Sequence, residues 1–277
     1  MKVALCFIIS YDHVLHKEHI WREWIEPNQD IINVYFYYKD FSKIKSSWIA
    51  KHSLPPNCIF KTSYYHVVPA YISLLEFASN HDPANTWFCM LTDSCCPIIS
   101  PTRFRAMFME HHSVSLFSWN PAWWNTLIHK RGNLAKLPRE LWLANTPWFV
   151  LTKENVKQVL HFVKYKKQLA LTICNGGVAN ESIFAIIFKM YHELDNPNGR
   201  IRSVVSHLTD WTRQTSPTSP YVFKEANETN IQFIETELER NQYGIFIRKI
   251  DRAFPDEVLR YYIYEYETNQ KKDATNS

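Results

Sequence analysis

The alternation of short apolar runs with helical stretches constrains the fold of this chain most strongly. Apolar runs typical of buried strands cover residues 3–9, 31–38 and 87–91. Between these runs, residues 13–25 and 67–79 space their apolar side chains as amphipathic helices do, with Pro69 in a first turn. A strand–helix–strand order favours a largely parallel sheet with helices on both faces. The sequence therefore predicts an α/β fold.

The second half of the chain continues this pattern less regularly. Helical spacing predicts helices over residues 153–165 and 181–191. Short apolar runs predict strands over residues 114–119, 148–151, 201–205 and 244–250. Serine, threonine and proline make residues 213–220 a loop. No linker or repeat divides the chain, so we expect one domain over residues 1–267 and a disordered polar tail over 268–277.

Composition excludes several classes of protein. Only 5 of the 277 residues are glycine, and they form neither a dinucleotide-binding fingerprint nor a phosphate-binding P-loop. The net charge of +4 is too small for a polycation and, without a basic stripe or RNA-binding aromatic motif, indicates no nucleic-acid partner. The same small excess suits one anionic small molecule.

No apolar run is long enough for a membrane span or a signal peptide. We therefore expect a cytoplasmic protein with free thiols on its six cysteines. Removal of an amino-terminal anchor would instead allow a secretory lumen. Asn180 and Asn227 begin glycosylation sequons, which would matter only there.

Polar residues that follow the predicted strands are the first candidates for a site. Ligands of open α/β sheets bind beyond the carboxyl ends of the strands. Ser10, Asp40 and Asp93 each follow a predicted strand. We expect these three residues to line a binding cavity.

Glu181 is the candidate general base. It follows a Gly-Gly loop at the predicted start of an apolar helix, where the helix N-terminus stabilises a carboxylate. A carboxylate in an apolar pocket can take a proton from a hydroxyl. The structural alternative is a simple capping residue.

Two further pairs of residues carry possible binding chemistry. Arg248 and Lys249 end the last predicted strand, and two adjacent cations can neutralise a diphosphate. They could equally be solvated surface charges. Asp210 and Trp211 offer a carboxylate beside an indole face, as sugar sites do, although Trp211 could also be a core residue.

The histidines and acidic residues do not predict a metal site. His16 and His19 have ligand spacing without an acidic partner, and His111 and His112 are adjacent. The chain contains no Asp-x-Asp pair, which metal-dependent sugar-nucleotide enzymes usually need. We expect no metal and no other cofactor.

Taken in order, these segments resemble the core-2/I-branching β-1,6-N-acetylglucosaminyltransferase family, glycosyltransferase family 14. The resemblance spans roughly residues 3–255. The stretches that carry it are "VALCFII", "HIWREW", "NVYFYYKD", "HVVPAYISLLEFASNHDPANTWFCMLTDSCCPIIS", "LANTPWFVLTKENVKQVL", "GVANESIFAIIFKM", "SHLTDW" and "IFIRKID".

The resemblance implies a GT-A-like Rossmannoid fold and an inverting, metal-independent transfer from a UDP-sugar, with N-acetylglucosamine, xylose or a related sugar as donor. Glu181 falls on the family's catalytic base, and Lys249 with Arg248 falls on the cation that replaces the metal. The other implied donor contacts are Ser10, Asp40, Asp93 and Lys224. The implied acceptor contacts are Trp211, Asp210 and Trp148. The acceptor would be a glycan or glycoconjugate.

The chain also departs from the family pattern. Asn145-Thr146 replaces a Gly-Ser pair, and Asn180 replaces the aspartate before the catalytic glutamate. These departures leave open a sugar- or nucleotide-binding protein that has lost turnover. A glycoside hydrolase would need Asp93 or Asp210 opposite Glu181.

Overall fold

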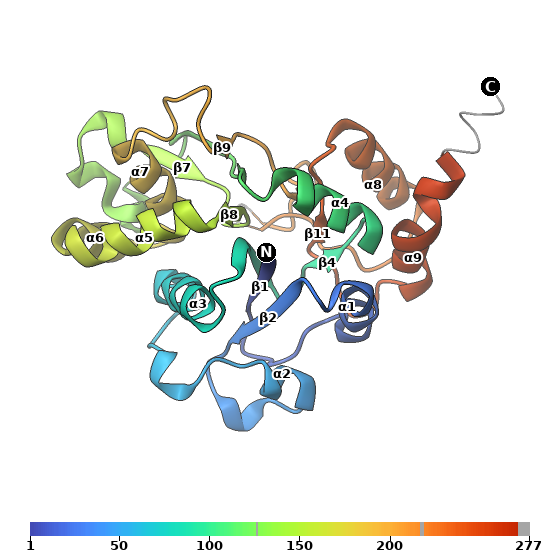
Figure 1. Ribbon diagram of the computed structural model, residues 1–277. Coiled ribbons are helices and arrows are strands. Elements are labelled where there is room, and N and C mark those ends of the chain that lie inside the picture. Colours follow the sequence, from blue (N-terminus) through green and yellow to red (C-terminus); the bar gives the residue numbers. More distant parts are fainter. Residues whose placement is uncertain (126, 217–218, 271–277) are drawn as a thin grey trace.

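A six-stranded mixed sheet forms the centre of the molecule (Figure 1). The computed structural model describes residues 1–125, 127–216 and 219–270. The strand order is β2-β1-β3-β8-β5-β9, with bounds Ile32–Tyr37, Lys2–Ile8, Asn85–Thr92, Val150–Thr152, Ser115–Leu116 and Ile201–Arg202. Strand β1 pairs in parallel with β2 and β3, and β5 pairs in parallel with β9. Only β8 runs antiparallel to its neighbours β3 and β5. The predicted α/β fold with a mostly parallel sheet is confirmed.

Both faces of the sheet are buried, which explains the continuous apolar runs. In β1, Val3, Leu5 and Phe7 belong to one core, whereas Ala4 and Cys6 belong to the other. All five side chains are fully buried. The period of two along a strand thus builds a core on each side of the sheet.

Helices cover the two faces separately (Figure 1). The core that contains Ala4 lies under α3, α5, α6 and α7, with bounds Val68–His81, Lys153–Tyr165, Lys167–Cys174 and Ile183–Met190. The core that contains Phe7 lies under α1, α4, α8 and α9, with bounds Glu18–Ile25, Pro101–His111, Glu228–Arg240 and Asp256–Arg260. Helix α2 (Ser47–Lys51) follows β2.

Two small sheets complete the framework. One has the order β10-β11-β4, with bounds His207–Thr209, Phe246–Arg248 and Cys96–Pro97. The other pairs β6 (Trp119–Pro121) with β7 (Leu143–Asn145). Hydrogen bonds from Ile98 N to Ile245 O (3.0 Å) and from Ile250 N to Ser94 O (2.8 Å) join the first small sheet to the segment after β3. The end of β11 therefore meets the ends of β1 and β3 along one edge.

Several predicted boundaries were wrong. Helix α1 begins at Glu18 rather than at residue 13, because His13 has a φ of 54°, which no right-handed helix tolerates. The strand predicted over 114–119 is split into β5 and β6. Glu181 ends a short 3₁₀ turn (Ala179–Glu181) instead of starting α7, because Ser182 has a φ of −142° that breaks the helix.

Two predicted segments, the tail over 268–277 and the loop over 213–220, include residues that the structure does not describe. Of the tail predicted over 268–277, residues 268–270 are helical, and residues 271–277 lie outside the part of the chain that the structure describes. The loop predicted over 213–220 is described except for residues 217–218. Within the described ranges, no helix has the length and apolar character that crossing a membrane requires.

Candidate active site

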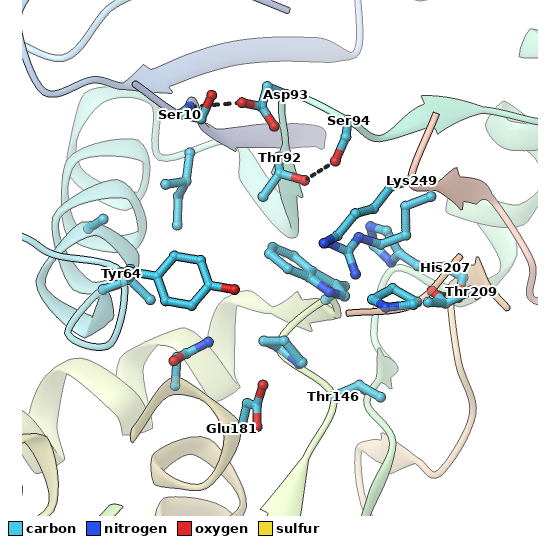
Figure 2. A pocket seen from close by; sticks show the side chains of 18 of the residues that line it. Ser10, Tyr64, Thr92, Asp93, Ser94, Thr146, Glu181, His207, Thr209 and Lys249 are labelled. Carbon is cyan, nitrogen blue, oxygen red and sulfur yellow. Dashed lines mark hydrogen bonds between the residues drawn. The ribbon is translucent and has the colours of Figure 1, made fainter. Parts of the chain in front are cut away.

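A cavity of about 670 Å³ opens beyond the carboxyl ends of β1, β3, β10 and β11. Its size suits a ligand of drug or nucleotide-sugar dimensions. Figure 2 shows the side chains that project into it: Ser10 and Asp93 lie on one side, Glu181 on another, and Lys249 with His207 on a third. The sheet edge predicted to bind a ligand is therefore the edge that carries the cavity.

Six of the predicted site residues other than Glu181 line this cavity: Ser10, Asp93, Trp148, Trp211, Arg248 and Lys249. Buried Asp93 accepts a hydrogen bond from Ser10 N at 2.9 Å through Oδ2. This bond fixes the loop after β1 to the turn after β3. Trp211 is 47% exposed, so its ring is available to a ligand rather than packed in the core.

Glu181 reaches the cavity from the turn before α7. Burial raises the pKa of its carboxyl group, and the positive charges of Arg131 and Arg248 act in the opposite direction. The turn is held from β7, because Asn145 Nδ2 donates to Asn180 O (2.9 Å) and Asn145 Oδ1 accepts from Ala185 N (3.2 Å). The Asn145 that departs from the family pattern thus anchors the segment of the candidate base.

Arg248 is a buried cation at the inner wall of the cavity. Its side chain is part of a residue only 4% exposed, and its guanidinium lies 4.1 Å from the centre of the Trp148 ring. Its Nε has no hydrogen-bond partner, and among the described residues no carboxylate lies within 4 Å of it. Burial lowers the pKa of Arg248, and its neighbours Cys95, Tyr71 and Asp93 act in the opposite direction. Because no carboxylate pairs with it directly among the described residues, a bound anion would stabilise its charge.

Lys249 adds a second cation beside Arg248. Its Nζ donates to Ser219 Oγ at 2.7 Å. Burial lowers the pKa of Lys249, and the neighbouring Arg248 charge lowers it further. Two adjacent cations in a partly dry cavity can bind a diphosphate strongly.

The structure does not bring three of the predicted residues into the cavity lining. Asp40 caps a 3₁₀ turn through a hydrogen bond from Ser42 N (3.1 Å), and Lys39 lines the cavity in its place. Asp210 is 1% exposed, and both carboxylate oxygens accept hydrogen bonds from its own loop, including one from Arg213 Nε at 2.6 Å. Lys224 is exposed outside the cavity. These positions do not support the predicted ligand contacts.

Sequence reasoning missed several lining residues. Arg131, Tyr64, Tyr71 and His207 all face the cavity. The pKa of His207 is held well below its usual range by burial and by the Arg248 charge, so its ring is neutral. The available signal was a histidine two residues after the strand predicted over 201–205, inside the "SHLTDW" stretch. Tyr64 lies in an irregular segment and Arg131 in a 3₁₀ helix (Ile128–Lys136), and neither stretch of sequence carries such a signal.

The described residues include no group of three histidine, cysteine, aspartate or glutamate side chains that could hold a metal ion. All six cysteines have free thiols, and Cys6, Cys89, Cys95 and Cys96 are buried. Arg131, Arg248 and Lys249 contribute positive charge to the cavity lining.

A sequence profile of the Core-2/I-Branching enzyme family matches residues 36–235 of this chain. No curated protein sequence matches. Among solved structures, one similar fold is the crystal structure of a glycosyltransferase involved in the glycosylation of the major capsid of PBCV-1. The two chains share 9% sequence identity with a TM-score of 0.41, over 90% of this chain and 94% of the other.

Proposed function

Because the chain belongs to the Core-2/I-branching enzyme family of glycosyltransferases, we propose that it is an inverting, metal-independent transferase of GT-A type. It moves a sugar such as N-acetylglucosamine or xylose from a UDP-sugar to a hydroxyl of a glycan or glycoconjugate. The observation that carries this proposal is the cavity itself: Glu181, Arg248 and Lys249 all line it, and Glu181 and Lys249 project from different sides (Figure 2).

In the proposed reaction, the acceptor hydroxyl attacks the anomeric carbon from the face opposite the diphosphate. The new C–O bond forms as the bond to the diphosphate oxygen breaks, and the electron pair of that bond stays on the diphosphate. Glu181 takes the hydroxyl proton, a role that its raised pKa favours because a stronger base accepts a proton more readily. The transition state has oxocarbenium character.

The two cations stabilise the leaving group. Negative charge grows on the diphosphate as the glycosidic bond breaks, and fixed charges aimed at that position cost no reorganisation during the step. Arg248 is held by the Trp148 ring, and Lys249 by Ser219. This is the work that a divalent ion performs in metal-dependent transferases.

The test is transfer from a panel of UDP-sugars to simple glycosides, measured with EDTA and with Mn²⁺. We expect product in EDTA, with inverted anomeric configuration by NMR. Glu181→Gln should lower kcat by about 10²–10⁴-fold while UDP affinity stays near that of the parent protein. Activity that vanishes in EDTA and returns with Mn²⁺ would contradict the role of the cations.

The alternative of a binding protein without turnover predicts a different outcome of the same panel. Such a protein would bind a UDP-sugar and release neither transfer product nor free UDP. A hydrolase that pairs Glu181 with Asp210 is disfavoured, since both oxygens of Asp210 are engaged within its own loop. The expected cytoplasmic location stays a prediction, and a glycan on Asn180 of the native protein would contradict it.

A further inference from the structure

Arg131 forms an ion pair with Glu181, the candidate base. Its Nη2 lies 3.7 Å from Glu181 Oε2, and the two side chains are 18% and 29% exposed. Both residues line the cavity. A charge pair at this distance and burial is screened less than a surface pair, so it affects the protonation of the carboxylate.

The Arg131 side chain is placed by an aromatic ring. Its guanidinium carbon lies 4.5 Å from the centre of the Trp124 ring, within the range of a cation–π contact. Stacking restricts the guanidinium to one plane and leaves its edge free for the carboxylate. The ring therefore aims the positive charge at Glu181.

The backbone around Arg131 has an unusual conformation. Lys130, Gly132 and Asn133 have φ values of 49°, 53° and 49°, in the left-handed region. Side chains other than glycine rarely adopt this conformation unless the surroundings enforce it. Some other part of the chain must therefore hold this segment.

Helix α6 and the Gly176-Gly177 loop that follows it supply that hold. Gly132 N donates to Gly177 O at 2.9 Å, and Asn133 Nδ2 donates to Thr172 O at 2.6 Å. A Cβ on Gly176 would lie 2.2 Å from Asn133 N, so only glycine permits this close approach. The same loop leads directly into the turn that carries Glu181, which ties both partners of the ion pair to one support.

The other ionisable groups near Glu181 do not replace Arg131. Arg248 also lowers the pKa of Glu181, but it is the smaller influence of the two, and bound diphosphate would neutralise it. Tyr71 is a buried neutral phenol, whose pKa burial raises. Arg131 is thus the cation that acts on the base while the donor is bound.

We propose that Arg131 is a positioning residue that keeps Glu181 ionised and oriented for proton transfer. The catalytic consequence rests on the proposed function, whereas the electrostatic effect on Glu181 does not. The two can therefore be tested separately.

The first test needs no activity. The carboxyl of Glu181 is titrated by ¹³C NMR in the ligand-free protein, with its signal assigned by its loss in Glu181→Gln. We expect the midpoint to move upward by at least about one pH unit in Arg131→Gln. Arg139→Gln is the matched control, because Arg139 also stacks on a tryptophan (4.1 Å from the Trp142 ring) but does not line the cavity. An unchanged midpoint in Arg131→Gln would overturn the proposal.

The second test separates positioning from general damage. In a kcat/KM profile, Arg131→Gln should move the acid limb upward, so that at the midpoint of the parent's limb the variant has at most about a fifth of the parent rate. The activity of Arg131→Gln should recover toward higher pH. Arg131→Lys keeps a positive charge, so its acid limb should lie between those of Arg131→Gln and the parent protein. A loss of equal size at every pH would contradict the role of Arg131, while absent turnover in the parent protein would contradict only the proposed function.

Discussion

Replacing Arg248 by methionine should make the protein more stable and at the same time weaken its binding of a diphosphate. Methionine keeps most of the buried length of the side chain and its packing on Trp148, but it removes the charge. In the ligand-free protein Arg248 is 4% exposed and its Nε has no hydrogen-bond partner. Among the described residues no carboxylate lies within 4 Å of its guanidinium group. Such an arrangement costs folding free energy, and a bound anion would recover part of it.

The magnitudes follow from that burial. Replacing buried charged groups by apolar ones of similar volume stabilises proteins by about 1–4 kcal/mol in favourable cases. In a chain of this size each kcal/mol raises Tm by about 2–4 °C. Truncating one partner of a buried, hydrogen-bonded charge pair costs about 2–5 kcal/mol of binding free energy. The Kd for UDP should therefore rise by about 30- to 4000-fold.

Thermal denaturation with and without UDP measures both effects in one experiment. Arg248→Met should raise Tm without ligand and lose the further rise that UDP causes in the parent protein. Lys224→Met is the control, because Lys224 is an exposed cation outside the cavity and should change neither value. A lower Tm together with an undiminished response to UDP would show that Arg248 is a structural residue.

Two further predictions concern the protein outside the reaction. The pKa of Asp82 is lowered from 3.8 to about 2, first by the Asn33 hydrogen bond and then by Ala84 N and Lys2. Its contribution to stability is complete above pH 3.8 and lost as the pH falls toward 2. Asp82→Asn should accordingly lower the free energy of unfolding, measured in urea at neutral pH. The variant should also lose less of this free energy than the parent protein as the pH falls from 3.8 toward 2. An equal loss in both proteins would show that Asp82 does not contribute to acid sensitivity. Burial raises the pKa of the thiols of Cys6, Cys89, Cys95 and Cys96, and that of Cys174 to about 11. Native protein should therefore react quickly with a thiol reagent at Cys58 alone, and fast labelling at any buried position would contradict the packing described.

Local patterns were sufficient to predict the strands of the main sheet and four of the helices that pack on it, α1 on one face and α3, α5 and α7 on the other. The run over β1 and the spacing over α5 predicted these elements because each buries a regular set of apolar side chains. The small sheet of β10, β11 and β4 was not predicted as a sheet. Its strands have only two or three residues, too few to show a period.

The sequence predicted those residues of the candidate site that lie next to recognisable strands or helices. It did not predict the residues that only tertiary contacts bring to the cavity. Glu181, Arg248 and Lys249 follow recognisable segments and were predicted from them, and the structure places all three in the cavity lining. Arg131 was missed, because a turn with left-handed residues brings it to the cavity and a loop about 45 residues later holds it there. Asp210 was assigned to the ligand, but local hydrogen bonds to its own loop occupy its carboxylate, as is common for aspartate in turns.

A crystal structure of Glu181→Gln with an intact UDP-sugar would show whether the two cations and the candidate base act on the same bound donor. We expect the diphosphate oxygens to lie within hydrogen-bonding distance of Arg248 and Lys249, and the anomeric carbon to face the side chain at position 181. A nucleotide bound away from both cations, or a sugar ring turned away from position 181, would contradict this expectation.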